Sequence, residues 1–479
     1  MPKPSDIAAM DACALSRAIH SKEISCVEVM SATLDRIDAL NPKVNAVVSL
    51  QDRGDLLAQA RARDGELARS ESRGWMHGFP HAVKDLTATK GIRTTQGSRI
   101  FKDFVPATDA IMVERLKNAG AIIIGKTNTP EFGLGSNTYN DVFGRTLNPY
   151  DPSKSCGGSS GGAAVGIALR MLPVADGSDH GGSLRNPAAW NNVFGFRTSY
   201  GRVPSQAPDM FYAWMGVQGP MARNVPDLAA LVSVQAGYDP RMPLSNRQDP
   251  APFAQDLKRD FKGARIAWSG DIGGLIPFEP GVIDLCKSSL KTFEALGCTI
   301  EEAWPDYPIE RVFPTWRKLR AWQAGTALKD HYNDPGKRAL MKPEAQFEVE
   351  GGQKLSAFEV YDASVARTTW YQAVRAFFEK YDFWILPAGQ VFTFDAALDW
   401  PREIAGRTMD TYHRWMEVMI PVTMSSCPAI AVPAGFNAAG LPMGLQIAGP
   451  NHSELALLQL AAAYDEASNW VSKRPPALA

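Results

Sequence analysis

The 479-residue chain lacks the marks of a membrane, secreted or nucleic-acid-binding protein. No stretch approaches the roughly 18 consecutive apolar residues that a transmembrane helix needs. The first residues contain no cationic segment followed by an apolar core, so we expect no signal peptide. Lysine and arginine total 50 against 51 acidic residues, which leaves a net charge of −1. That balance argues against a broad basic surface, and we expect neither nucleic acid nor a membrane as a partner.

The chain is also poor in paired cysteines. It has six, all scattered, and none of them forms a C-x-x-C motif. This spacing argues against a disulfide framework and a zinc site, and it favours a reducing compartment. We therefore expect a cytoplasmic protein with no metal and no cofactor.

Helices and short apolar strands alternate along the chain, which indicates an α/β layered fold. Ser25 and Glu28 have the spacing of a capping box, so a helix is expected to begin there and to end at Asn41-Pro42. Residues 428–432 and 443–447 are expected to form a strand pair joined by a turn.

The domain organisation is predicted to be simple. The sequence contains no internal repeat, no low-complexity tract and no long linker. We therefore expect one large domain over residues 1–479. Residues 308–380 are mostly helical in pattern, with a polar, ragged middle from 327 to 355, and are expected to form a helical cap or subdomain within it.

A glycine-rich stretch from 157 to 183 is the most informative part of the chain. It begins with GGSSGG and ends with Gly181-Gly182-Ser183. Glycine permits positive φ and close approach, so main-chain N–H groups can converge there beside serine hydroxyls. This favours a nucleophilic acyl-transfer site, with an ordinary turn as the alternative. A phosphate cradle is disfavoured because the stretch lacks the G-x-x-x-x-G-K-[ST] spacing.

Lys84 lies in the short apolar run 78–86, where strand interiors rarely place a lysine. If this run is a strand, the side chains of Lys84 and Asp85 point to opposite faces, so Asp85 is not the obvious partner of the lysine.

Taken together, these pieces resemble the amidase signature family. The ordered set is Lys84, then GGSSGG at 157–162, then D-x-G-G-S-x-R at 179–185, with 75 residues from Lys84 to Ser159 and 24 from Ser159 to Ser183. Supporting similarity extends over nearly the whole chain. The resemblance implies a large mixed central β-sheet covered by α-helices on both faces, and the hydrolysis of an amide C–N bond through an acyl-serine.

The resemblance also implies the roles of individual residues. Ser183 matches the nucleophile, Ser159 the bridging serine that follows a cis peptide bond, and Lys84 the base. The main-chain N–H groups of the turn would form the oxyanion hole, from residues His180, Gly181, Gly182 and Ser183. Three further residues match supporting positions: Ser160 beside the lysine, and Asp179 and Arg185 bracing the turn.

This assignment needs an unusual lysine. An unperturbed lysine has a pKa of about 10.4 and is almost wholly charged at pH 7, but burial lowers that pKa. Ser159 can then accept a proton from Ser183 and donate one to the neutral amine.

Two side chains in these loops invite other interpretations. His180 lies inside the oxyanion turn, and we expect its side chain to face away from the substrate. Cys156 precedes the first glycine pair, and with no partner evident we expect a packed, inert thiol.

The pocket is predicted from the loops 132–140 and 205–216. Candidate substrate-binding residues are Phe132, Gly133, Thr138, Phe211 and Trp214. Aromatic side chains supply broad apolar surface, so a bulky aryl or alkyl amide is the expected substrate, with core packing as the alternative role of these aromatics.

Two rival functions remain. One is the glutaminase (A) subunit of a tRNA-dependent amidotransferase, which shares the triad but needs partner subunits. The other is a non-catalytic binding protein with the same fold, against which the presence of all three triad residues argues. The resemblance also implies a homodimer.

Overall fold

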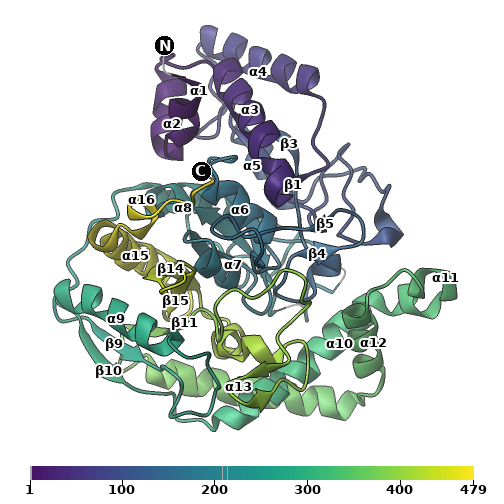
Figure 1. Ribbon diagram of the computed structural model, residues 1–479, viewed down its shortest axis with the longest axis vertical. Coiled ribbons are helices and arrows are strands. Elements are labelled where there is room, and N and C mark those ends of the chain that lie inside the picture. The colour runs from purple at the N-terminus through teal and green to yellow at the C-terminus, as the bar shows by residue number, and fades with distance from the viewer. Residues whose placement is uncertain (1–2, 208, 213, 479) are drawn as a thin grey trace.

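The computed structural model describes residues 3–207, 209–212 and 214–478, and eight strands of this described chain form one large mixed sheet (Figure 1). Its order is β10 (Thr299–Glu302), β9 (Arg265–Trp268), β11 (Phe383–Pro387), β15 (Pro442–Ala448), β14 (Ala429–Phe436), β7 (Phe194–Arg197), β8 (Val217–Ala222), β6 (Ala175–Asp179). The first three strands are parallel, and the pairs from β11 to β6 are antiparallel. The predicted large mixed sheet and the predicted pair β14–β15 are confirmed.

A second, smaller sheet carries the lysine of the sequence motif. Its order is β1 (Val47–Val48), β3 (Ile122–Thr127), β2 (Pro80–Lys84), with β2 parallel to β3. The apolar run 78–86 is therefore a strand, as the pattern suggested. β2 packs beside β6 at the edge of the large sheet, and this places Lys84 next to the glycine-rich stretch.

Helices pack on both faces of the large sheet. α7 (Arg185–Trp190) lies against β14 and β15, while α9 (Val282–Ala295) and α15 (Glu454–Ser468) pack on β14 from the other side (Figure 1). α6 (Gly161–Ala168) is buried along its whole length because it contains only small and aliphatic residues. α8 (Val225–Gln235) covers β8, and α16 (Trp470–Lys473) lies near the end of the chain.

The N-terminal helices lie together at one end of the molecule (Figure 1). They are α1 (Pro4–Ala9), α2 (Ala12–His20), α3 (Cys26–Val44), α4 (Arg53–Ala68) and α5 (Ile111–Asn118). The capping box of Ser25 and Glu28 starts α3 as predicted. The predicted end at Pro42 is wrong: the helix continues to Val44, and Asn45 ends it in the left-handed conformation while donating its N–H to the carbonyl of Asn41.

The helical region lies at the opposite end of the molecule (Figure 1). Its helices are α10 (Val312–Asn333), α11 (Pro335–Arg338), α12 (Pro343–Gln353) and α13 (Ala357–Phe377). α10 and α12 pack closely at Gly325, where a Cβ would lie only 2.7 Å from the carbonyl oxygen of Glu348. α14 (Ile420–Ser425) connects this region to the nucleophile turn, since it contacts both α10 and α13 and accepts hydrogen bonds from Arg185.

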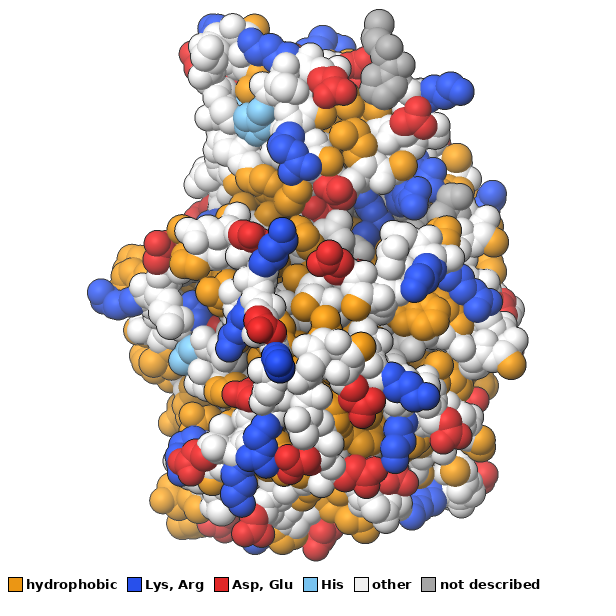
Figure 2. All heavy atoms as spheres, turned by 90° about the vertical axis from the view of Figure 1, so that its left-hand side faces the viewer, with side chains coloured by type: hydrophobic (Ala, Val, Ile, Leu, Met, Phe, Trp, Pro, Cys, Tyr) orange, Lys and Arg blue, Asp and Glu red, His pale blue; other side chains and the backbone are white. Residues whose placement is uncertain are grey.

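The surface carries both signs of charge. Figure 2 shows lysine and arginine side chains interspersed with aspartate and glutamate over one face. In the part of the chain that the structure describes, no helix combines the length and the hydropathy needed to cross a bilayer.

Candidate active site

Lys84 is the last residue of β2, and its side chain is fully buried. Its Nζ lies 2.8 Å from Oγ of Ser159, 2.8 Å from Oγ of Ser160 and 3.0 Å from Oγ of Ser178. These three contacts match the capacity of a neutral amine, which has two N–H donors and one lone pair. Ser160 can donate its own proton to the carbonyl of Ser178 at 3.3 Å, so it can accept from Nζ. Ser159 is then free to donate to the lone pair.

The electrostatic setting favours that neutral amine. Burial lowers the pKa of Lys84 from 10.5 to about 7, while the charges of Asp176 and Asp179 partly oppose the shift. Asp176 does not form an ion pair with the lysine: its carboxylate contacts Nε2 of His81 at 2.9 Å and accepts the main-chain N–H of Lys84 at 3.2 Å. A substantial fraction of Lys84 is therefore uncharged near neutral pH.

The GGSSGG loop holds the two serines against this amine. The Gly158–Ser159 peptide bond is cis, as the family resemblance implied. Thr138 fixes the loop from outside, because its N–H and its Oγ1 both donate to the carbonyl of Gly157, at 3.1 and 2.8 Å. Ser160 is the residue before α6, and its N–H donates to the carbonyl of Ser183 at 3.2 Å. That bond ties the two serine loops together.

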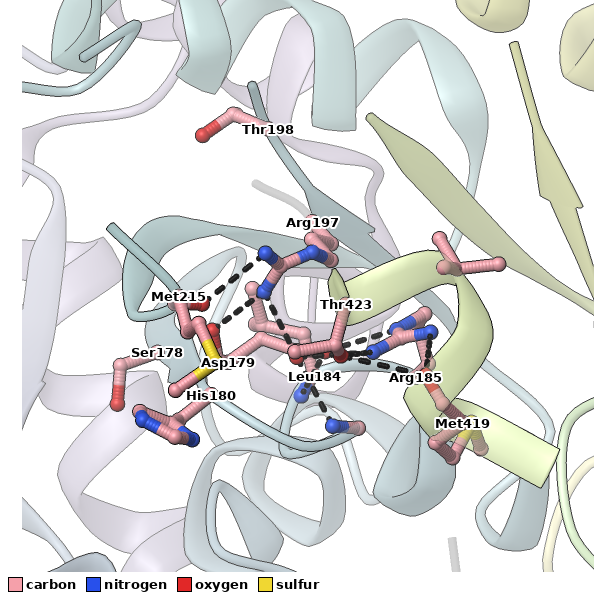
Figure 3. A network of polar contacts seen from close by, with 12 residues as sticks. Ser178, Asp179, His180, Leu184, Arg185, Arg197, Thr198, Met215, Met419 and Thr423 are labelled. Atoms are coloured by element: carbon pink, nitrogen blue, oxygen red, sulfur yellow. Dashed lines mark hydrogen bonds and ion pairs between the residues drawn. The ribbon is translucent and has the colours of Figure 1, made fainter. Parts of the chain in front are cut away.

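Asp179 braces the turn that carries Ser183 (Figure 3). Its carboxylate accepts the N–H of Gly182 at 2.9 Å and that of Leu184 at 3.2 Å. Arg185 binds the same carboxylate with two parallel hydrogen bonds of 3.0 Å, and Arg197 reaches it at 3.2 Å. All three charged side chains are fully buried. Asp179 and Arg185 therefore brace the turn, and Arg197 is a third member that the sequence analysis missed.

The charge of this brace is well determined. Burial alone would raise the pKa of the Asp179 carboxyl, but Arg185 and Arg197 hold it well below its usual range. Burial lowers the pKa of Arg197 to about 10, so both partners remain charged at neutral pH. Such charge-assisted, bidentate hydrogen bonds are short and directional, which fixes the backbone of the turn.

The turn leaves fewer free N–H groups than expected. Gly182 donates its N–H to Asp179, so that group points into the brace. The N–H groups of Gly181 and Ser183 make no hydrogen bond to another described residue. Gly182 has φ of +106°, and a Cβ there would lie 2.6 Å from Cγ of Met419, so this position requires glycine.

Ser183 is 7% exposed, against 2% for Ser159 and none for Lys84. Among the described residues, no side-chain hydrogen bond holds its hydroxyl. The three residues thus run from a buried amine through a shielded hydroxyl to a hydroxyl open enough to meet a substrate.

The side chain of His180 turns toward the helical region. Its Nδ1 lies 3.1 Å from Nη1 of Arg320, and its Nε2 lies 3.2 Å from Oε1 of Gln323, both on α10. Burial, reinforced by the charge of Arg320, lowers the pKa of His180 to about 3, so the ring is neutral. A neutral ring can accept from the arginine and donate to the glutamine. His180 therefore connects the nucleophile turn to α10.

Arg320 belongs to a buried polar cluster. Its Nε lies 2.7 Å from Oε1 of Glu348 on α12, and Nε2 of His413 lies 2.8 Å from the same oxygen. Tyr412 also donates its hydroxyl to Glu348. Burial would raise the pKa of Glu348, but the charge of Arg320 and the contact with His413 hold it well below its usual range. We call this set, with His180, the His180–Arg320 cluster.

The candidate pocket residues are dispersed. Phe132 packs in a small apolar cluster with Leu328 and Met341 of the helical region. Gly133 adjoins the site, since a Cβ there would lie 3.5 Å from Oγ of Ser159. Phe211 is exposed, and Trp214 lines a cavity beside α10 and α13. Thr138 supports the GGSSGG loop, as described above.

Cys156 is a packed thiol, as expected. It is fully buried, and burial raises its pKa to about 12.

Ser178 and Asp176 were not anticipated as neighbours of Lys84. Their spacing carried a usable signal, because residues two apart on a strand share one face. β6 presents both of them toward β2.

A buried neutral lysine, a serine pair in contact with it and a braced turn presenting a third serine define a class of protein, the serine-type amidohydrolases. The comparisons with known proteins specify the family. The amidase family model matches residues 28–458. An acylamidase of Rhodococcus erythropolis is 34% identical, over 97% of both chains. One of the subunits of the glutamyl-tRNA(Gln) amidotransferase of Thermosynechococcus vestitus is 35% identical, over 96% of this chain and 98% of that protein.

Solved structures agree. A bacterial aryl acylamidase of the amidase signature family superposes with a TM-score of 0.90 at 28% identity, covering 97% of each chain. The chain therefore belongs to the amidase signature family, and it is an amidase.

Proposed function

We propose that Ser183 is the nucleophile of this amidase, Ser159 the relay and Lys84 the base. The observation that carries the assignment is the fully buried Nζ of Lys84, 2.8 Å from Oγ of Ser159. Ser183 attacks the amide carbonyl while its proton passes to Ser159, and the proton of Ser159 passes to Lys84. The same relay then returns a proton to the leaving amine, and water hydrolyses the acyl-serine.

The oxyanion of the tetrahedral intermediate would bind to main-chain N–H groups of the turn. We assign this role to Gly181 and Ser183 first, because their N–H groups make no other hydrogen bond among the described residues. His180 remains a candidate donor through its main chain. Gly182 acts indirectly, since its bond to Asp179 keeps the turn in shape. Each donor of this kind contributes about 3–4 kcal/mol to catalysis.

The proposed substrate is a bulky aryl or alkyl amide. The cavity beside the nucleophile turn is lined by Tyr212, Trp214 and Trp322, which favours a flat apolar group. The similarity to an acylamidase and to an aryl acylamidase supports the same class.

A substrate panel tests this proposal. Purified protein is given anilides, short aliphatic amides, cyclic amides and glutamine, and the released amine or ammonia is measured. We expect kcat/KM for an anilide to exceed that for acetamide and for glutamine by at least about tenfold. Preference for acetamide or glutamine would overturn the assignment of the substrate.

The glutaminase of a tRNA-dependent amidotransferase is the second candidate, since the relatives include such subunits. Glutamine carries an α-ammonium group that needs an acidic partner. Among the described residues that line the cavity there is no aspartate or glutamate. This observation favours the amidase without partner subunits. Labelling of Ser183 by a fluorophosphonate would exclude a non-catalytic binding protein.

We further propose a single domain in which residues 308–380 act as a cap over the site, with no nucleic acid or membrane partner. The His180–Arg320 cluster supports the cap, since it joins α10 and α12 to the nucleophile turn. A homodimer is proposed on the exposed apolar side chains Phe358, Tyr361 and Val365, at helical spacing on α13. Light scattering of the purified protein measures that state. Free cysteines fit the proposed cytoplasmic location.

A further inference from the structure

A cavity of about 450 Å³ lies between the nucleophile turn and the helical region. α10 supplies Leu319, Trp322 and Gln323, and α13 supplies Val360, Ser364 and Arg367. The loop before β8 closes it with Tyr212 and Trp214. Tyr212 is 50% exposed, so the cavity reaches the surface.

Arg367 gives this largely apolar cavity a positive charge. Among the described lining residues it is the only side chain that is charged. Its Nε donates to the carbonyl of Met424 at 3.1 Å, and its Nη2 donates to Oγ of Ser426 at 2.7 Å and to the carbonyl of Trp214 at 3.4 Å. These bonds fix the plane of the guanidinium group against α14 and the loop before β8.

One edge of that guanidinium group is unused. Nη1 makes no hydrogen bond to a described residue, and it is absent from the buried atoms that lack a partner, so it faces accessible space. No carboxylate of the described chain lies within ion-pair distance of Arg367, whereas Arg185, Arg197, Arg202 and Arg320 all have one. The arginine is thus held in place, largely desolvated and without a counter-charge.

The aromatic side chains define what surrounds the charge. The rings of Tyr212 and Trp322 meet edge to face at 5.3 Å, and Tyr212 and Trp214 lie 5.6 Å apart. The guanidinium carbon of Arg367 lies 6.0 Å from the centre of the Trp214 ring. A ligand that reaches Nη1 therefore passes between apolar walls.

The cavity is also linked to the nucleophile turn. Gln323 lines it and contacts Nε2 of His180 at 3.2 Å, and the amide of Gln323 donates to the carbonyl of Tyr212. Occupancy of the cavity is therefore felt three residues from Ser183.

We propose that this cavity is a binding site for a carboxylate carried on an aromatic or branched apolar stem, with Arg367 as the residue that binds the carboxylate. The carboxylate has two sources, a remote acid group of the substrate or a free acid such as the product. Only this role in turnover rests on the proposed amidase function; the binding itself does not.

The first test is calorimetric binding to the full-length protein. The probes are 3-phenylpropionate and 3-phenylpropan-1-ol, which share a carbon skeleton and differ in charge. We expect saturable binding of the acid, weakened by salt, and at least about tenfold weaker binding of the alcohol, because a charged hydrogen bond contributes roughly 1.5–3 kcal/mol. Equal affinity for the two probes would overturn the proposal.

Three variants locate the site. Arg367→Gln should weaken binding of the acid about tenfold and leave the alcohol unchanged. Ser364→Phe fills the cavity without touching the hydrogen bonds of Arg367, so it decides the matter if Arg367→Gln fails to fold, and it should abolish binding of both probes. Arg375→Gln, on the exposed side of the same helix, is the matched control and should bind as the wild type does. Unchanged binding of the acid in the folded cavity variants would overturn the site.

The second test separates the two sources. A dicarboxylic acid monoanilide and its methyl ester are compared as substrates. If the carboxylate belongs to the substrate, KM is lower for the acid, and the difference disappears in Arg367→Gln. If it is a free acid, the two anilides are hydrolysed alike and 3-phenylpropionate inhibits. Should no amide be hydrolysed, the proposed function fails, and the calorimetric test still decides the binding site.

Discussion

Nζ of Lys84 and Oγ of Ser159 lie 2.8 Å apart, and the lysine that makes this contact is fully buried. The contact joins a strand of the small sheet to a loop 75 residues further along the chain. Its chemistry depends on the protonation of one amine, because an ammonium group cannot accept a proton. The first two predictions concern that protonation.

The pH profile of kcat/KM should rise through about pH 7, where burial places the pKa of Lys84. Below that value the amine is charged and cannot act as the base, so the rate falls about tenfold for each pH unit. His180 does not contribute, since its pKa lies near 3. Steady-state assays from pH 5 to 9 measure the profile. A rate that is constant or falls between pH 6 and 8 would contradict this role.

Lys84 should also cost stability in a pH-dependent way. Its pKa is 10.5 when unperturbed and about 7 in the folded protein, so the unfolded chain binds more protons between these values and stability rises with pH across that window. The difference in unfolding free energy between Lys84→Met and wild type should therefore shift by about 5 kcal/mol in favour of wild type from pH 7 to 10.5. Urea unfolding measures it.

Lys126 supplies the matched control for this prediction. It is a second buried lysine, with a pKa lowered by burial to about 8, and it contacts Thr87 and Thr89 but none of the triad serines. Lys126→Met should show a smaller shift of the same sign and keep its turnover. A pH-independent difference between Lys84→Met and wild type would mean that the buried amine stays charged.

The three serines around Nζ should differ in importance. Ser159→Ala removes the relay and should lower kcat about 10²–10⁴-fold. Ser178→Ala removes only one acceptor at 3.0 Å and should lower kcat less than about tenfold. Active-site titration corrects for misfolded protein. Equal losses in the two variants would argue that the serines merely solvate the lysine.

The His180–Arg320 cluster should stabilise the protein and align the turn. Glu348→Gln leaves Arg320 buried without its carboxylate and should cost about 3–5 kcal/mol of unfolding free energy. Thermal unfolding measures this loss. Glu350→Gln, nearby on α12 but half-exposed, is the control and should change stability by less than about 1 kcal/mol. Similar effects of the two substitutions would show that the cluster contributes little.

The same cluster predicts an effect of acid. The pKa of Glu348 lies well below its usual range in the folded protein, so its contribution is present above pH 4.5 and is lost as the pH falls below that value. Wild-type protein should therefore lose stability on acidification more steeply than Glu348→Gln. Parallel unfolding curves from pH 6 to 3 would contradict it.

Much of the site was predictable because it lies in local motifs. Lys84, GGSSGG and the turn at 179–185 are contiguous patterns, and the family resemblance orders them. Arg320, Glu348 and His413 were not predictable, because they come from three segments whose meeting depends on how the helical region packs. Asp176 and Ser178 lay in between: their period of two was readable only once residues 175–179 were known to form a strand.

The most direct test of the central claim is covalent labelling by a fluorophosphonate, followed by mass spectrometry of the digested protein at several pH values. We predict one adduct, on Ser183, whose rate of formation rises through about pH 7 and is lost in Lys84→Ala while that variant stays folded. An adduct on another residue, or equally fast labelling of Ser183 in Lys84→Ala, would contradict the account.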